Sequence, residues 1–204
     1  MNKIIFSLCI AFLSSISLNA QLTAQGILDN VISQYSKDKT ISADFFISSL
    51  QGQTKGSIVM AGNKFRLLSR EAKCWYNGAV QWSYSTATDE VNITKPTQEE
   101  LQMSNPYAAI NSFKNYNIAL LKSNTASNYL LRLIPKIINS SFKEIRLSVA
   151  KSTYHLVKII FILDDNSTYT TTISNYKAGG NYPQSTFIFN KKEVPKGTQI
   201  VDLR

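Results

Sequence analysis

The sequence predicts a mainly β protein, in which one antiparallel sheet curls into a barrel or partial barrel and a few helices cover one face or plug the mouth. Three observations predict this fold. Short apolar segments recur at a spacing of about 8–12 residues, with turn-forming residues between them. Helical periodicity is confined to a few short segments. No low-complexity linker, internal repeat or domain break interrupts the chain, so we expect a single domain.

The first twenty residues have the pattern of a secretory signal peptide. Lys3 precedes an apolar run from Ile4 to Leu13, and small and polar residues follow up to Ala20. The run is too short to span a bilayer, which takes about 20 apolar residues. Cys9 lies inside the run, so it is a poor candidate for a lipid-modified terminus. We therefore expect cleavage near Ala20 and an exported domain over residues 21–204.

The first half of this domain begins with a helix and continues as strands. Thr23 is a good N-cap for an amphipathic helix that ends near Lys37. Beyond it the apolar residues alternate, as in a half-buried strand. We expect strands over 41–48, 56–61 and 64–70, with turns at 51–55 and 62–63.

The segment from Lys73 to Tyr107 is the most informative. Asn77-Gly78 is a strong hairpin signal because both residues tolerate positive φ. Aromatic and aliphatic residues then alternate with polar ones, which predicts strands with one apolar face. That face is expected to carry Val80, Trp82, Tyr84, Val91 and Ile93.

A short helix should follow these strands. Thr97 and Glu100 form a capping box. Glu99 beside Glu100 is assigned to the helix dipole rather than to catalysis, since adjacent residues on a helix do not converge. Asn105 and Pro106 begin a second helical segment. Further strands are expected over 129–134, 144–149, 156–163, 169–173 and 186–189, with a Gly-rich connection at 177–183.

Catalytic and metal-binding patterns are missing from the sequence. His155 is the single histidine, and no Ser, Cys or metal-ligand motif accompanies it. Cys74 is the one cysteine of the predicted exported domain, so it forms no internal disulfide and is expected to be a small buried hydrophobe rather than a reactive thiol. We expect no enzyme, no cofactor and no metal.

The net charge of +9 is scattered along the chain rather than gathered in a tail. It indicates a generally cationic surface, with anionic lipid as a candidate partner. Export argues against nucleic acid.

Several motifs, taken in order, resemble the periplasmic outer-membrane lipoprotein carrier (LolA-like) family, and the similarity covers nearly all of the expected exported domain. They are Ile41-Ser42-Ala43-Asp44-Phe45, Gly56-Ser57-Ile58, Asn63-Lys64-Phe65, the Asn77-Gly78 hairpin with Trp82-Ser83-Tyr84, Asn105-Pro106-Tyr107 and the closing Val201-Asp202-Leu203-Arg204. The best-studied members carry a lid-locking arginine in the turn after the second strand. This chain has Ala61-Gly62-Asn63 in that turn and lacks the arginine.

The resemblance implies an unclosed antiparallel half-barrel with a helical lid over a hydrophobic cavity. It also implies a monomeric periplasmic carrier that takes acylated lipoproteins from an inner-membrane lipoprotein-releasing ABC transporter. Delivery would be to the outer membrane surface or to an acceptor there. The alternative is a non-catalytic sensor, or a carrier of another lipid, on the same half-barrel.

Strand parity and the resemblance together predict the acyl-chain site. Phe65 and Leu67 match family positions near the ligand pocket, and strand parity supplies the other residues. An error of one residue in a strand would move its whole set to the other face, and an ordinary packed core is the alternative for each residue. The predicted site consists of Ile58, Met60, Phe65, Leu67, Val80, Trp82, Tyr84, Val91 and Ile93, and the predicted lid of Leu101, Met103, Ile110 and Phe113.

Overall fold

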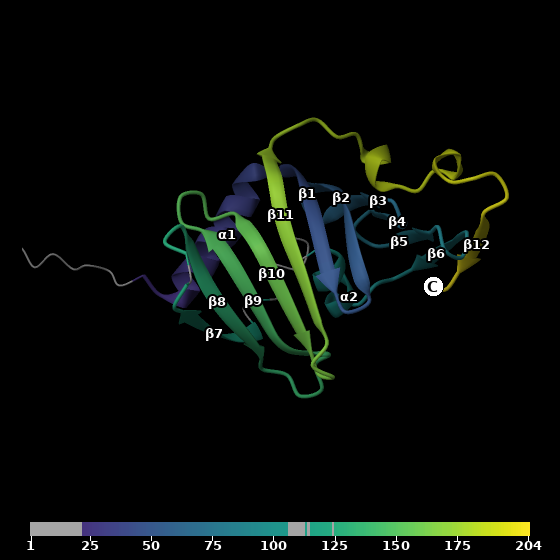
Figure 1. Cartoon of the computed structure of the whole chain (residues 1–204). Coiled ribbons are helices and arrows are strands. Elements are labelled where there is room, and N and C mark those ends of the chain that lie inside the picture. The colour runs from purple at the N-terminus through teal and green to yellow at the C-terminus, as the bar shows by residue number, and fades with distance from the viewer. Residues whose placement is uncertain (1–21, 106–112, 114, 124) are drawn as a thin grey trace, which may run out of the picture.

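A computed structural model describes residues 22–105, 113, 115–123 and 125–204. These residues form one open twelve-stranded sheet in the order β12-β6-β5-β4-β3-β2-β1-β11-β10-β9-β8-β7 (Figure 1). The fold class predicted from the sequence is confirmed: the protein is mostly β, and its sheet does not close into a barrel. The strands are β1 (Thr40–Ser49), β2 (Gly52–Ala61), β3 (Lys64–Ser69), β4 (Ala72–Tyr76), β5 (Gln81–Ser85), β6 (Glu90–Thr94), β7 (Tyr116–Leu121), β8 (Asn128–Pro135), β9 (Phe142–Ala150), β10 (Leu156–Leu163), β11 (Thr168–Ala178) and β12 (Gln199–Asp202).

The sheet consists of two meanders joined side by side. Strands β1 to β6 form one and β7 to β11 the other, and β1 pairs antiparallel with β11 to unite them. Among the described strands, β12 alone pairs in parallel, with β6. The union of β1 and β11 places residues from distant parts of the sequence opposite each other, such as Phe45 and Ile173.

Two α-helices of the described chain, α1 (Ala24–Asp38) and α2 (Gln98–Ser104), begin at the N-caps that the sequence predicts. Thr23 Oγ1 accepts a hydrogen bond from the Gly26 amide at 3.0 Å. Thr97 and Glu100 form both halves of the capping box. Neither helix is long and apolar enough to cross a membrane.

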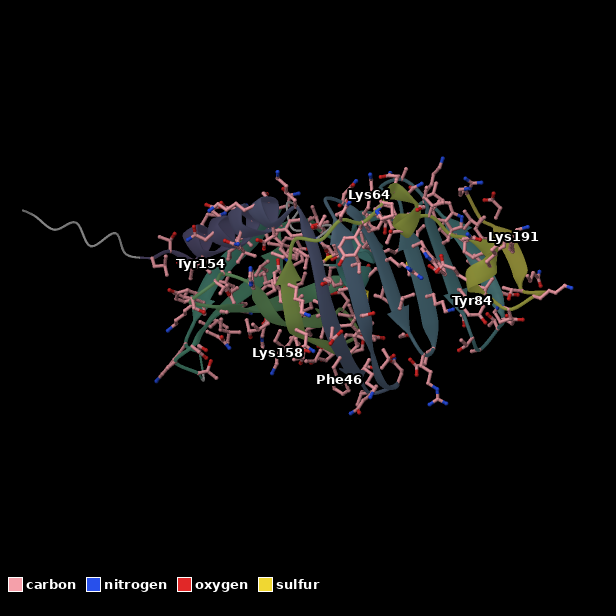
Figure 2. All side chains as sticks on the ribbon, turned by 90° about the horizontal axis from the view of Figure 1, so that it is seen from above. Phe46, Lys64, Tyr84, Tyr154, Lys158 and Lys191 are labelled. Atoms are coloured by element: carbon pink, nitrogen blue, oxygen red, sulfur yellow. The ribbon has the colours of Figure 1, made fainter. Side chains whose placement is uncertain are left out.

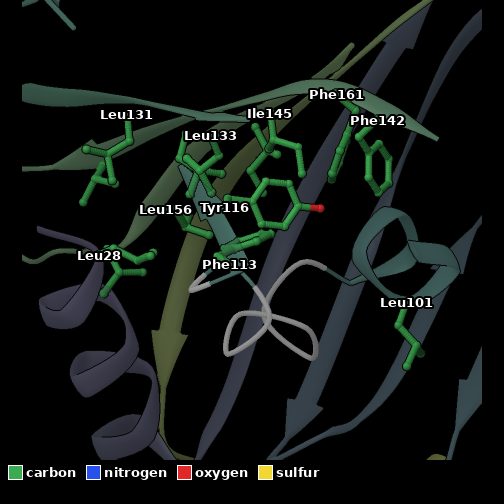
Figure 3. Close-up of a cluster of buried hydrophobic side chains, with 14 of the residues drawn as sticks. Leu28, Leu101, Phe113, Tyr116, Leu131, Leu133, Phe142, Ile145, Leu156 and Phe161 are labelled. Carbon is green, nitrogen blue, oxygen red and sulfur yellow. The ribbon is translucent and has the colours of Figure 1, made fainter. Parts of the chain in front are cut away.

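The face of the sheet on which α1 packs is called the inner face here, and it carries the main core. Ile27, Leu28 and Val31 of α1 are fully or almost fully buried against it. Farther along the same face, the Phe113 and Tyr116 rings meet edge to face with centroids 5.9 Å apart. Figure 3 shows this pair beneath the sheet, among the side chains of Leu133, Ile145 and Leu156. Apolar side chains of the protein itself therefore fill much of the inner face.

The opposite, outer face has a second, smaller core over β4, β5 and β6. Trp75, Tyr84 and Val91 are buried there, and the segment after β11 covers them with Phe189 and Val194. This covering segment contains the 3₁₀ helices η2 (Gln184–Phe187) and η3 (Lys191–Glu193) and then β12. Figure 2 places Tyr84 and Lys191 at one end of the molecule and Tyr154 at the other.

Several boundaries differ from those expected. The turn predicted at 51–55 is wrong, because β2 already begins at Gly52 and pairs with β1 up to Ser49. The strand predicted at 186–189 is wrong, because residues Gln184–Phe187 form the 3₁₀ helix η2 after Pro183. The described strands show no pairing with this segment. The hairpin predicted at Asn77-Gly78 is confirmed, because β4 pairs antiparallel with β5 and the Asn77 amide donates to the Val80 carbonyl at 3.2 Å. The Asn77 side chain reinforces the turn, since its Oδ1 accepts from the amides of Ala79 and Val80. The expected signal peptide, the helix from Pro106 and Ile110 lie outside the described residues.

The outer-face core gives a prediction about stability. Trp75 is fully buried, and its ring meets Phe189 at a centroid distance of 5.3 Å. Trp75→Ala should lower the free energy of unfolding by about 3–5 kcal/mol, because it leaves a large cavity under the C-terminal segment. Urea unfolding would measure this, and limited proteolysis should cleave within residues 184–204 sooner. Trp82→Ala, at a partly exposed position of the same cluster, should cost less. Unchanged protection of the C-terminal segment would contradict the assignment.

Candidate functional site

A small apolar cavity lies on the inner face, between the sheet and the end of α2. It has a volume of about 40 Å³ and is bounded by β1, β2, β3, β11 and the end of α2. Its walls are mainly aliphatic and aromatic, a surface suited to hydrocarbon. The lining includes Ala43, Phe45, Ile47, Ile58, Met60, Leu67, Met103, Thr171 and Ile173.

Three of the predicted acyl-chain residues meet in this cavity. Ile58 and Met60 of β2 and Leu67 of β3 all line it. The register explains this, because Ile58 opposes Leu67 across the β2–β3 pair. Phe65 opposes Met60 on the same face but is fully buried in the core, where its ring lies 5.4 Å from that of Tyr76.

Other predicted site residues lie on the opposite side of the sheet, and for them the expectation is corrected. The β4–β5 register places Trp82 opposite Trp75 and Tyr84 opposite Lys73, whereas Cys74 and Tyr76 belong to the inner-face core. The β5–β6 register carries Val91 and Ile93 to the outer face with them. Strand parity correctly predicted that these side chains share one face of the sheet. It could not show that this is the outer face, because the C-terminal segment that covers it is distant in sequence. Val80 lies in the loop before β5 rather than in the strand.

The predicted lid residues have different positions. Met103 of α2 lines the cavity and remains 38% exposed, so it forms the rim between the cavity and solvent. Leu101 is buried in the inner-face core, as is Phe113. Only Met103 of this group contacts the cavity among the described residues.

A carboxylate holds α2 against the loop between β8 and β9. Glu99 accepts hydrogen bonds from Ser140 Oγ at 2.8 Å and from Ser141 Oγ at 2.6 Å, and also from the Ser141 amide. Partial burial tends to raise the pKa of Glu99, but the bonds from Ser141 and Ser140 outweigh it and lower this pKa. The chain lacks the arginine that the resemblance implies, and this contact tethers the helix at another place. The sequence assigned Glu99 only to the helix dipole.

A second, buried hydrogen bond joins α2 to strand β7. Gln102 is 2% exposed, and its Oε1 accepts a hydrogen bond from Tyr116 Oη at 3.1 Å. Buried polar groups are stabilised by such pairing. Helix α2 is therefore held by directional contacts at Glu99 and Gln102 and by the burial of Leu101.

Several cavity residues were missed by sequence reasoning. The alternation of Ala43, Phe45 and Ile47 was visible and predicted a half-buried strand. It did not reveal a cavity, because the second wall, Ile173 on β11, comes from about 130 residues further along the chain. Strand order, which brings β1 beside β11, was the missing information.

The reactive side chains of the described chain are in protected settings. Burial raises the pKa of the Cys74 thiol to about 12, so it stays protonated near neutral pH. The His155 ring stacks on Tyr176 at 3.8 Å, and its Nε2 lies 3.2 Å from Asp38 Oδ2, so it ties the end of α1 to the sheet. Among the described residues, no group of three or more His, Cys, Asp or Glu side chains could hold a metal.

Comparison with known proteins identifies the fold and the sequence family. A family profile described as "Outer membrane lipoprotein carrier protein LolA" matches residues 13–162. No curated protein matches the sequence. An uncharacterised conserved protein from Thermus thermophilus superimposes with a TM-score of 0.59 at 14% identity, over 88% of this chain and 98% of that one. A DUF1329 family protein from Desulfovibrio piger gives a TM-score of 0.52 at 9% identity, over 85% and 99%.

The Glu99 contact predicts a pH-dependent difference in stability. A carboxyl whose folded pKa is lowered stabilises the fold at high pH, and this contribution is lost as the pH falls through that pKa. Glu99→Gln should therefore lower the free energy of unfolding by on the order of 1 kcal/mol at pH 7. The difference from wild type should vanish well below the ordinary value of 4.5. Urea unfolding of both proteins across pH would measure it. A difference that stays constant with pH would contradict the role of the charge.

Proposed function

Because the chain belongs to the outer membrane lipoprotein carrier protein LolA family, we propose that it is a periplasmic carrier that shields the acyl chains of lipoproteins on their way to the outer membrane. The profile covers most of the chain, and the inner face offers an apolar site beneath α2. The chemistry required is binding and release, for which no nucleophile or metal is needed.

The observation that carries this proposal is the cavity with Met103 at its rim. Ile58, Met60 and Leu67 provide hydrocarbon walls, and Met103 is a flexible apolar side chain that adapts to irregular ligands. Each methylene of an acyl chain removed from water contributes about 0.8 kcal/mol. A site with these walls therefore favours a hydrocarbon tail over a polar ligand.

The present volume sets a condition on the mechanism. A cavity of about 40 Å³ is far smaller than the roughly 300–1,000 Å³ typical of ligand sites. Helix α2 must therefore move away from the sheet before an acyl chain can enter. This movement breaks the contacts of Glu99 with Ser140 and Ser141, which join α2 to the loop between β8 and β9.

The partners follow from the proposed role. An inner-membrane lipoprotein-releasing ABC transporter would load the site, and the outer membrane or an acceptor there would unload it. A carrier of another lipid on the same fold is the alternative. Native mass spectrometry of the purified protein separates the two by the mass of the co-purified ligand. A triacylated peptide supports the proposal, and a free phospholipid or fatty acid would favour the alternative.

Acyl recognition predicts a sharp contrast between two peptides. The protein should keep a triacylated lipopeptide in solution and should not bind the same peptide without its acyl chains, because the site contacts hydrocarbon rather than the peptide. Sedimentation of the lipopeptide with and without protein would show this. Equal binding of both peptides would refute the carrier role.

The rim predicts which single change disrupts binding. Met103→Lys places a charge where the acyl chain must pass and should weaken lipopeptide binding at least about tenfold, since a buried charge is strongly disfavoured in hydrocarbon. Ile188→Lys is a matched control, because Ile188 is 39% exposed against 38% for Met103 and lies in the C-terminal segment away from the cavity. Both variants should fold normally. Equal affinity of the two would remove Met103 from the site.

A further inference from the structure

Three large apolar side chains stand in solvent at the tips of two loops. Leu50, between β1 and β2, is 96% exposed, and Ile137 and Ile138, between β8 and β9, are 63% and 90% exposed. Scattered apolar residues on a surface are normal. Two consecutive isoleucines and a leucine at this level of exposure are unusual when they share one end of the molecule.

The sheet register places both loops at the same end. Ser48 of β1 pairs with Thr170, and Ile162 of β10 pairs with both Thr168 and Glu144. The β1–β2, β10–β11 and β8–β9 connections therefore follow one another along a single margin of the sheet, the lower one in Figure 1. The cavity occupies the middle of these strands and reaches toward this margin at Ile47 and Thr171, while Met60 lines it farther from the margin.

The loop that bears the isoleucines also holds the helix over the cavity. Ser140 and Ser141, two and three residues beyond Ile138, donate the hydrogen bonds that Glu99 of α2 accepts. A displacement of this loop would therefore act directly on α2 through these hydrogen bonds to Glu99. An acyl chain that leaves past Met103 would emerge beside the same loop.

The charges around the tips are nearly balanced. Lys136 and Lys143 flank the isoleucines, and Asp164 and Asp165 occupy the neighbouring β10–β11 turn, where the Asp164 amide donates to the Ser141 carbonyl. Local attraction to an anionic surface is thus weak, and the apolar side chains must supply most of the binding. The net charge of +9 adds a general preference for anionic lipid over long range.

We propose that Leu50, Ile137 and Ile138 form a membrane-docking surface that inserts into the interface of an anionic phospholipid bilayer, next to the first turn of α2. The inference rests on the proposed carrier function, because it places the exit of the acyl chain against the acceptor membrane. It goes beyond that function by making the bilayer itself, rather than a protein receptor, the partner of this surface.

The shape of the surface favours a bilayer over a protein partner. Strands β11 and β10 lie between the loop of Leu50 and that of the isoleucines, so the three side chains do not form one contiguous patch. Protein interfaces concentrate their binding energy in a compact, well-packed centre. Separate convex protrusions suit the headgroup region of a bilayer, where amphipathic surfaces bury apolar side chains about 5–10 Å deep.

Vesicle flotation tests the proposal directly. The purified protein should float with vesicles of phosphatidylethanolamine and phosphatidylglycerol, and most of the binding should persist in about 1 M salt, where charges are screened within about 3 Å. Replacing both isoleucines (Ile137→Ser with Ile138→Ser) should weaken binding at least about tenfold, and adding Leu50→Ser should weaken it further. The conservative pair Ile137→Leu with Ile138→Leu should bind like wild type. Leu203→Ser is the matched control, since Leu203 is 61% exposed on the C-terminal segment.

The outcomes separate this inference from the carrier function. Lipopeptide binding in solution, measured on the same proteins, should not change in the serine variants. If the wild type binds lipopeptide but the serine variants float as well as the wild type, the docking surface is wrong and the carrier function stands. If the wild type binds no lipopeptide, the carrier function fails. Serine variants that lose binding to transporter-containing nanodiscs but not to lipid-only nanodiscs would overturn the bilayer in favour of a protein partner.

Discussion

The structure depends on one constraint: an open sheet of twelve strands has a long apolar inner face and only two short α-helices among the described residues to cover it. Helix α1 and the Phe113–Tyr116 pair cover the half built from β7 to β11. Over β1 to β3, the helix among the described residues is α2, which spans seven residues. The cavity lies between these strands and the end of α2, where Met103, Ser104 and Asn105 form its wall on the side away from the sheet.

The outer face must also be covered, because its strands carry bulky apolar residues as well. Over β4 to β6 the C-terminal segment provides this cover, since it shields Trp75 and its Glu193 forms an ion pair with Arg66. Its strand β12 then continues the sheet beyond β6. The aromatic residues of the β5 hairpin therefore pack in the outer-face core and stabilise the fold. The sheet wall of the cavity is formed by β1, β2, β3 and β11 instead.

Local chemistry in the sequence predicted much of this. Thr23 and the Thr97–Glu100 pair identified both helix starts, and alternation in β2 identified Ile58 and Met60, while the family resemblance supplied Leu67. Alternation could not tell which face of the Trp82 hairpin is inner, because both faces of this part of the sheet are covered and the covering segment is distant in sequence. Strand β7 was missed because Ala119 and Leu121 break the alternation. The tether at Glu99 was missed because its partners lie about 40 residues away.

The strength of the hold on α2 is consistent with reversible opening by an acyl chain. Exposing Leu101 costs about 2 kcal/mol, breaking the bonds to the charged Glu99 about another 2 kcal/mol, and breaking the Gln102–Tyr116 bond about 1 kcal/mol. Burial of hydrocarbon contributes about 0.8 kcal/mol per methylene, so about six methylenes offset the opening. A tail of ordinary length has more than this, and its surplus would keep the site loaded in water. A polar ligand lacks that contribution, and α2 would then stay closed on the sheet. On the proposed function, the helix that covers the cavity would therefore set its selectivity as much as the cavity walls do.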